Sequence, residues 1–261
     1  MVAVNARRRR RWTPRDELVA KFLSEQWIAD FATLMLLLGT RRSRTYKLME
    51  KWRDDFGAVH SDSLRPRGKD RAVTWVWATQ GTATRCLGYE ASAWVPRSTN
   101  LTHKGEVSRV RAALVGLETG VWVPERLLLR EAARKTPGLF AAGQASLLSQ
   151  FSARPHVHDG RYFDGERWWA VEVELTLKTP SARLLISVLA AYRTLQNGHG
   201  LLYVYATDRI GNALDSAIKE LIRAKKLPRS PGIRLRRLSA VIARRSIELP
   251  ASSAGPEEAV S

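Results

Sequence analysis

The stretch that decides the fold of the second half of the chain reads His158-Asp159-Gly160 and, one short hairpin later, Val171-Glu172-Val173-Glu174-Leu175-Thr176-Leu177-Lys178. Because a strand turns alternate side chains to opposite faces, we expect the valines and leucines of the second segment to be buried. The other face would carry Glu172, Glu174, Thr176 and Lys178. Two carboxylates and a lysine beside Asp159, which ends the preceding strand, can hold a divalent metal next to a phosphate.

The charge of the chain predicts a polyanionic partner. Its 261 residues include 43 Lys and Arg against 25 Asp and Glu, a formal net charge of +18. Each Lys or Arg that contacts a phosphate releases condensed counterions, so we expect double-stranded DNA as the main partner. Residues 1–100 carry 19 basic and 10 acidic side chains, which leaves 24 and 15 for the rest. Each part therefore has an excess of +9, and we expect phosphate contacts from both.

The cysteine count and the hydropathy pattern bound the compartment. Cys86 is the only cysteine, which excludes an intramolecular disulfide and a cysteine-rich zinc site. The longest apolar run, 31–38, is too short to span a membrane, and no signal-peptide core follows the basic N-terminus. We therefore expect a cytoplasmic protein without a membrane partner.

The first half is predicted to begin with three helices. Thr13-Pro14-Arg15-Asp16 is a helix start, with Thr13 as the N-cap, Pro14 at the first helical position and Asp16 near the positive end of the helix dipole. A second helix is expected over 28–38, ending at Gly39. The third helix is expected over 42–55.

This third helix has an apolar stripe on one face and a basic stripe opposite, the pattern of a recognition helix in a major groove. The apolar stripe consists of Thr45, Leu48, Met49, Trp52 and Phe56. The basic stripe consists of Arg44, Lys47 and Lys51, with Arg41 and Arg42 at the N-terminal end. We expect the basic side chains to contact DNA.

A β-hairpin formed by 58–63 and 73–78 is expected next. Its turn, marked by Pro66 and Gly68, carries cations that can reach phosphates, namely Arg65, Arg67, Lys69 and Arg71. Three helices and a hairpin with a basic tip predict a winged helix-turn-helix domain over 13–97, preceded by a basic arm over 1–12. The alternative is that these charges only form a solvated surface.

The second half is predicted to be an α/β domain over 98–245, so the chain as a whole is a multidomain α/β protein. The expected elements are a helix over 106–117, a strand over 121–129, the two strands around Asp159 and Glu172, a helix over 181–196, a strand over 201–205, a helix over 212–225 and a strand over 234–240. The small, polar and acidic segment 246–261 is expected to be a disordered tail.

Short segments along the chain carry a resemblance to known families. They are Thr13-Pro14-Arg15-Asp16, 76–81, 101–103, 122–126, His158-Asp159-Gly160, 172–176 and Tyr192-Arg193. The order αβββαβ, with an acid ending one strand and Glu-x-Glu on the next, resembles the PD-(D/E)xK nuclease superfamily with its restriction-endonuclease-like fold. Over about 13–240 the chain is similar to the replication-relaxation family of actinobacterial plasmids and mobile elements, which joins a winged helix to such a domain.

The resemblance implies a DNA-binding protein of a mobile element, acting in plasmid replication, mobilisation or its control, with a relaxase or a replication protein as a partner. The nuclease-like domain is then a candidate metal-dependent endonuclease. In that role Asp159 and Glu172 bind Mg²⁺, Glu174 assists, and Lys178 contacts the phosphate or the attacking water. A homodimer would let two winged helices read a palindrome and set two nuclease centres on opposite strands.

Two positions depart from the superfamily pattern, which has a proline before the aspartate and a lysine two residues after the second acid. This chain has His158 and Glu174 there. Lys178 lies roughly 13 Å beyond Glu174 along an extended strand, so its side chain must fold back to replace the lysine. Lys104 is an alternative source of that charge.

Other interpretations of the same residues stay open. One is a non-catalytic DNA-binding regulator or relaxase accessory protein with a degenerate nuclease fold, and another is an RNA-binding or general nucleoid protein that uses charge alone. The acids of the Glu-x-Glu segment can instead lie on an exposed face and pair with Arg161, Arg167 or Arg183. The histidines lack zinc-type spacing and are expected to be ordinary polar residues, namely His103, His156, His158 and His199.

Overall fold

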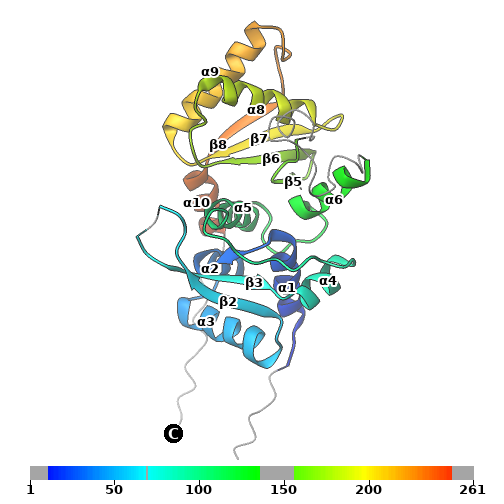
Figure 1. Cartoon of the computed structure of the whole chain (residues 1–261), viewed down its shortest axis with the longest axis vertical. Helices are drawn as coiled ribbons and strands as arrows, with labels where there is room; N and C mark the ends of the chain where they lie inside the picture. The colour runs from blue at the N-terminus through cyan, green and yellow to red at the C-terminus, as the bar shows by residue number, and fades with distance from the viewer. Residues whose placement is uncertain (1–10, 69, 136–155, 249–261) are drawn as a thin grey trace, which may run out of the picture. The chain divides into compact units, whose positions relative to one another are not determined.

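The structure, a computed structural model, describes residues 11–68, 70–135 and 156–248. These residues belong to two compact units that divide between Gly105 and Glu106, whereas the sequence places the boundary between 97 and 98. Each unit combines helices with a β-sheet, which confirms the mixed α/β class (Figure 1). Within the described ranges, no helix has both the length and the apolar character needed to cross a membrane. Most of the predicted arm and tail lie outside the described residues.

The N-terminal unit joins helices to a three-stranded antiparallel sheet with the order β1-β3-β2. Its helices are α1 (Pro14–Gln26), α2 (Phe31–Leu38), α3 (Arg42–Glu50), a π-turn η1 (Lys51–Asp55), α4 (Gln80–Leu87) and the start of α5 (Leu101–Leu114). Its strands are β1 (Ala29–Asp30), β2 (Val59–Leu64) and β3 (Val73–Ala78). The hairpin agrees with the prediction, but α2 starts later than expected because Ala29 and Asp30 pair with β3.

The capping residues of α1 and α2 form as the sequence indicates. The hydroxyl of Thr13 accepts a hydrogen bond from the Asp16 amide while the Asp16 carboxylate accepts one from the Thr13 amide, a complete capping box. Gly39 ends α2 in the left-handed conformation that favours glycine. Both helix ends are thus decided locally.

Asp16 also makes contacts that the local pattern does not indicate. Its side chain is fully buried and accepts hydrogen bonds from Lys51 Nζ and Trp52 Nε1, each at 2.6 Å. Burial opposes ionisation of this carboxyl, but the bonds from Lys51, Trp52 and Thr13 outweigh it and lower its pKa. The carboxylate therefore fastens η1, and with it the end of α3, to the first turn of α1.

Lys51 is consequently not on the basic stripe, and this part of the prediction was wrong. The physical reason is the π-turn that begins at Lys51, because each π-turn holds more residues than an α-turn and rotates the following side chains about the axis. Thr45, Met49 and Trp52 are buried as predicted. Phe56, expected on the same stripe, is 36% exposed and packs edge-on against Trp12.

The second unit is built on a five-stranded sheet with the order β4-β5-β6-β7-β8. The strands are β4 (Trp122–Pro124), β5 (Gly160–Phe163), β6 (Trp168–Glu174), β7 (Gly200–Tyr205) and β8 (Ile233–Arg237). The pairs β4–β5 and β5–β6 are antiparallel, and the pairs β6–β7 and β7–β8 are parallel. The continuous apolar run of β7 suits its position between β6 and β8, since both faces of this strand are covered.

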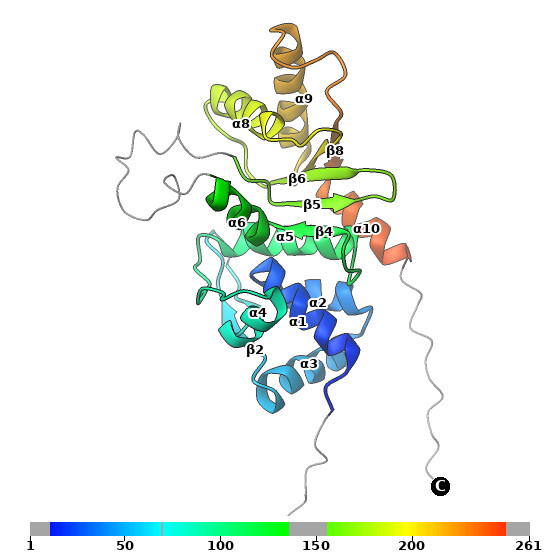
Figure 2. The ribbon, with the colours of Figure 1, turned by 90° about the vertical axis from the view of Figure 1, so that its right-hand side faces the viewer.

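Helices cover both faces of this sheet (Figure 2). On one face α8 (Ser181–Arg193) and α9 (Asp208–Arg223) pack with Ala170, Leu201 and Tyr203 into the main core. On the other, α10 (Leu238–Glu248), which the sequence did not indicate, contacts β7 and β8. The candidate functional site lies on the face of the sheet that α8 covers.

Two of the predicted strands are too long. Only Trp122–Pro124 is extended in the segment 121–129, and the rest belongs to the helix α6 (Glu125–Lys135), because Pro124 lacks an amide for the ladder and Glu125 suits a first helical turn. Likewise β6 ends at Glu174, opposite Tyr205 at the end of β7. Beyond that pair the chain turns toward α8, so residues 175–178 do not continue the strand.

The buried Asp16 contacts predict a large loss of stability in Asp16→Ala. Removing the carboxylate leaves the Lys51 ammonium buried without its partner, which typically costs about 3 to 5 kcal/mol of unfolding free energy. Urea denaturation measures it. Glu17→Ala is the matched control, since Glu17 lies in the same helical turn but forms an exposed ion pair with Arg85 and should cost about 1 kcal/mol or less. Equal losses in the two variants would contradict the anchoring role of Asp16.

Candidate functional site

Strand β6 presents its acidic side chains to the face of the sheet that α8 covers. The register pairs Glu172 with Tyr203 and Glu174 with Tyr205, and Ala170 and Tyr203 pack in the core beneath α8 and α9. Since side chains alternate, Glu172 and Glu174 share that face. They are sheltered, with 14% and 10% of their side chains exposed. Expected ion pairs with Arg161, Arg167 or Arg183 do not form, because nearer cationic groups occupy both carboxylates.

Two histidines meet at Glu172. His156 Nε2 and His158 Nδ1 each lie 2.7 Å from Glu172 Oε1, and the two rings stand edge to face with centroids 5.1 Å apart. Sequence reasoning missed this pair. The signal was present in the spacing His-x-His just before β5, since alternate residues of an extended segment point to one side.

Asp159 is held beside them by the backbone of β6. Its Oδ2 accepts a hydrogen bond of 2.8 Å from the Val173 amide, and its own amide donates to the Val171 carbonyl. Gly160 follows directly because any Cβ there would overlap the Trp122 ring. Asp159 is thus brought next to Glu172 of β6, but it lies directly before β5 and not, as the sequence predicted, at the end of a strand.

Lys178 returns to the site from the loop after β6. Its ammonium forms an ion pair with Glu174 and donates a 3.1 Å hydrogen bond to Ser187 Oγ on α8. The side chain therefore folds back toward the strand, the condition for replacing the missing lysine. It does so through a turn of the backbone and not by continuing the strand. Lys104, the alternative, lies in the part of α5 that belongs to the N-terminal unit.

We call His156, His158, Asp159, Glu172, Glu174 and Lys178 the acid–histidine cluster. Burial raises the pKa of Glu172, but the contacts from His156 and His158 outweigh it and lower that pKa to about 2. Burial opposes protonation of His156, yet Glu172 outweighs it and raises the pKa of this imidazole. Burial and the charges of Glu172, Glu174 and Asp159 raise the pKa of Tyr203 well above its usual value. The cluster is a region of strong negative field balanced by nearby cations.

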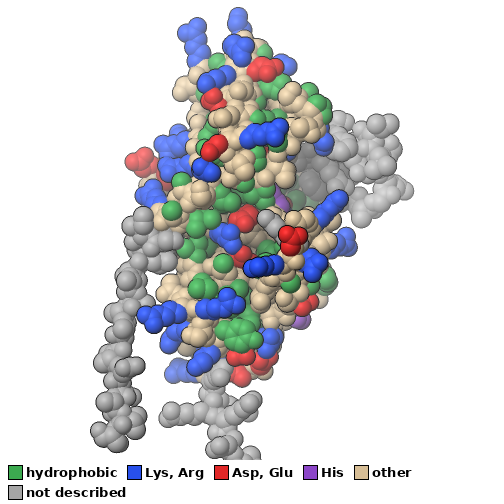
Figure 3. Space-filling model, turned by 90° about the vertical axis from the view of Figure 1, so that its left-hand side faces the viewer, with side chains coloured by type: hydrophobic (Ala, Val, Ile, Leu, Met, Phe, Trp, Pro, Cys, Tyr) green, Lys and Arg blue, Asp and Glu red, His purple; other side chains and the backbone are tan. Residues whose placement is uncertain are grey.

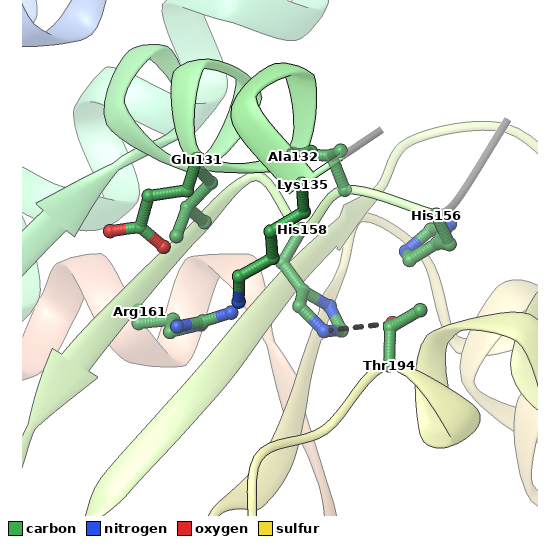
Figure 4. A pocket seen from close by; sticks show the side chains of 9 residues that line it. Glu131, Ala132, Lys135, His156, His158, Arg161 and Thr194 are labelled. Atoms are coloured by element: carbon green, nitrogen blue, oxygen red, sulfur yellow. Dashed lines mark hydrogen bonds between the residues drawn. The ribbon is translucent and has the colours of Figure 1, made fainter. Parts of the chain in front are cut away.

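A cavity of about 290 Å³ opens beside the two histidines. Figure 4 shows α6 supplying Glu131, Ala132 and Lys135 on one side, Arg161 of β5 below, and His156, His158 and Thr194 on the other. The lining therefore contains more cationic than anionic groups. Such a cavity is suited to an anionic group approaching the cluster.

The N-terminal unit carries the second candidate surface, the α3 basic face, which we define as Arg41, Arg42, Arg44 and Lys47. All four are exposed, whereas Lys51 is buried against Asp16. A hollow of about 690 Å³ is lined by Arg41, Arg42, Ser43, Tyr46, Lys47 and Glu50. The Arg42 guanidinium stands 5.6 Å from the centre of the Phe31 ring of α2, and this ring also contacts Tyr46 of α3.

The hairpin tip adds cations to the same unit. Arg65, Arg67 and Arg71 are exposed, and Lys69 lies outside the described residues. Figure 3 shows Lys and Arg side chains over much of the visible face of each unit, among apolar and tan atoms. The charge excess is thus distributed, and the α3 basic face is distinguished by its placement on one helix.

Comparison of the chain with models of protein families, with curated proteins and with solved structures finds no match.

The contact with Glu172 predicts that His156 stays protonated to a higher pH than an ordinary histidine. In metal-free protein its pKa, followed by NMR of the ring protons, lies above 6.5 and falls in Glu172→Gln. Glu166→Gln in the exposed β5–β6 turn is the control and should leave it unchanged.

The same contact gives the sign of a pH effect on stability. The raised pKa of His156 contributes stability below about pH 6.5 that is lost as the pH rises through the folded value. The lowered pKa of Glu172 contributes stability above about pH 4.5 that is lost as the pH falls toward 2. The unfolding free energy of wild type, measured by urea denaturation, should therefore exceed that of Glu172→Gln by the largest amount between about pH 4.5 and 6.5. If the difference in unfolding free energy between wild type and Glu172→Gln stayed constant from about pH 3 to pH 9, the pairing would be contradicted.

Proposed function

We propose that this chain is a DNA-binding protein of a mobile element and a member of the replication-relaxation family, acting in plasmid replication, mobilisation or its control. The observation that carries the proposal is the distribution of buried and charged residues on α3. One face of this helix is buried through Thr45 and Met49, and the opposite face exposes Arg44 and Lys47. Arg41 and Arg42 are exposed at its N-terminal end. A helix seated on a core by one face and basic on the other is suited to lie in a major groove.

The arrangement of the N-terminal unit supports a winged helix-turn-helix. Helices α1, α2 and α3 follow one another, and the β2–β3 hairpin comes next with exposed arginines at its tip. The buried Asp16 contacts hold α1 against the end of α3, so the basic helix has a fixed support. In this proposal α3 contacts base edges and phosphates in the major groove while the hairpin tip reaches the neighbouring backbone.

The topology of the second unit supports a PD-(D/E)xK nuclease-like domain. Among the described residues, and apart from α6, the order from α5 through β4, β5, β6 and α8 to β7 is αβββαβ. The strands β4, β5 and β6 are antiparallel, and β7 is parallel to β6. A relaxase or a replication protein is the proposed protein partner, and a palindromic DNA site would recruit the chain as a homodimer.

DNA binding through α3 predicts a loss of affinity in Arg44→Ala plus Lys47→Ala. Two lost phosphate contacts should weaken binding to duplexes of about 30 base pairs tenfold or more and reduce the slope of log K against log salt by about 2. Fluorescence anisotropy with a random-sequence duplex pool across a salt series measures both quantities.

Arg53→Ala plus Arg85→Ala is the matched control. It removes the same charge from the same unit, but these arginines already pair with Asp54 and Glu17. Equal losses in the two double variants would mean that only total charge matters. Equal affinity for RNA of the same length, without any footprint on DNA, would favour a nucleoid or RNA-binding protein instead.

A second function, metal-dependent DNA cleavage, is favoured by the return of Lys178 to Glu174. The carboxylates of Asp159 and Glu172 are oxygen donors of the kind that Mg²⁺ accepts, so these residues fit the cofactor that the resemblance implies. Bound Mg²⁺ would polarise the phosphate and acidify a water. Lys178, held by Glu174 and Ser187, would then contact a phosphate oxygen.

Cleavage predicts that the full chain nicks supercoiled plasmid in the presence of Mg²⁺, and that Asp159→Ala and Lys178→Ala each reduce the rate at least about a hundredfold. Glu166→Ala on the exposed turn is the control and should nick like wild type. Loss of nicking with unchanged DNA affinity would support catalysis. No nicking by wild type, or equal nicking by all variants, would reject it and leave the non-catalytic regulator, which Glu174 in place of lysine favours.

A further inference from the structure

We propose that His156, His158 and Glu172 form a site for a divalent transition-metal ion, with Zn²⁺ as the reference ligand. The ligand atoms of all three residues lie within 4.8 Å of one another. Two imidazole nitrogens and one carboxylate oxygen are a donor set that zinc, cobalt and other transition metals accept, whereas Mg²⁺ and Ca²⁺ prefer oxygen alone. The site does not depend on whether the chain binds DNA, but it shares Glu172 with the Mg²⁺ site of the cleavage hypothesis.

The hydrogen bonds around Thr194 fix the orientation of His158. The Thr194 hydroxyl sits 3.1 Å from the Ala191 carbonyl and 3.2 Å from the Ala190 carbonyl, the usual acceptors for a helical threonine. Its single proton is used there, so it accepts from His158 Nε2, 3.2 Å away. The Nδ1 atom of His158 is then the one directed at Glu172.

That orientation requires a cation between His158 and Glu172. A neutral imidazole ring with its proton on Nε2 presents a lone pair at Nδ1. Glu172 Oε1, 2.7 Å from His158 Nδ1, presents another lone pair. His156 Nε2 approaches the same oxygen at the same distance. Without metal, each contact needs a proton between the ring nitrogen and the carboxylate oxygen. One dication can replace both protons, and binding it would release them.

The surroundings match a metal site with an open side. Ligand atoms on one tetrahedral ion with bonds of about 2.1 Å stand roughly 3.4 Å apart. The two 2.7 Å contacts must therefore widen, while the two histidine nitrogens lie within 4.8 Å of each other. Thr194 is the partner of the outer nitrogen of His158, an arrangement that commonly orients metal-binding histidines. The cavity of about 290 Å³ adjoins both rings and leaves room for water or an anionic group on the ion.

The charge of the neighbourhood also favours a dication. Asp159 adds its field to that of Glu172 at His156, and Glu172, Glu174 and Asp159 all act on the buried Tyr203. Lys178 pairs with Glu174, not with Glu172. Tyr203 is 2% exposed, and its buried hydroxyl has no hydrogen-bond partner among the described residues. A polar group is therefore buried within reach of this field without a partner in the described part of the chain.

The test is titration of the chelator-treated full chain with Zn²⁺ by calorimetry, and with Co²⁺ by visible absorption. We expect one ion per chain, Co²⁺ bands typical of nitrogen ligation, and no displacement by excess Mg²⁺. His158→Gln and Glu172→Gln should each reduce the affinity for Zn²⁺ at least about a hundredfold. Thr194 only orients His158, so Thr194→Val should reduce this affinity about tenfold. His60→Gln on the surface of β2 is the control and should bind like wild type.

Circular dichroism establishes that each variant folds, and the Co²⁺ spectrum of wild type tests the site without any substitution. Absence of stoichiometric binding by wild type, or equal affinity in His158→Gln and His60→Gln, would overturn the proposal. DNA affinity measured on the same samples is a separate readout. Metal binding with no DNA binding would reject only the proposed function, and DNA binding with no metal would reject only this site.

Discussion

The central position of β6 is the constraint on which the second unit depends. This strand pairs antiparallel with β5 on one side and parallel with β7 on the other. The β5 pairing brings Asp159 to the amide of Val173, and the β7 pairing sets Glu172 beside Tyr203 on the α8 face. Because β6 and β7 end together, the chain must turn at Glu174, and that turn returns Lys178. One set of pairings therefore positions most of the acid–histidine cluster.

This arrangement creates an electrostatic demand that the protein meets with side chains from other elements. Carboxylates on a sheltered sheet face are costly unless cations accompany them. His156 and His158 come from the segment before β5, and Lys178 from the loop before α8. The cluster thus concentrates exchangeable protons and a lysine around oxygen ligands, a setting in which a metal ion can replace protons at little structural cost.

The N-terminal unit uses a buried charge differently. Asp16 is enclosed and satisfied by Thr13, Lys51 and Trp52, and it fixes one helix against another. This leaves Arg44 and Lys47 as exposed cations on a firmly supported helix. Buried polar contacts serve support in this unit, while in the second unit they surround a cavity. The difference lies in access, because the Asp16 carboxylate is sealed, whereas the two histidines that contact Glu172 line a cavity.

The sequence by itself determined the features that depend on near neighbours. The Thr13 cap, the Gly39 stop, the β2–β3 hairpin and the mixed α/β class follow from residue types within a few positions, and so does the proximity of Asp159 to Glu172 across one hairpin. The tertiary structure alone decided which side chains meet from afar. A π-turn sent Lys51 to Asp16, strand pairing ended β6 before Lys178, and packing of α8 brought Thr194 to His158. These outcomes depend on register and on long-range contacts, which residue periodicity does not encode.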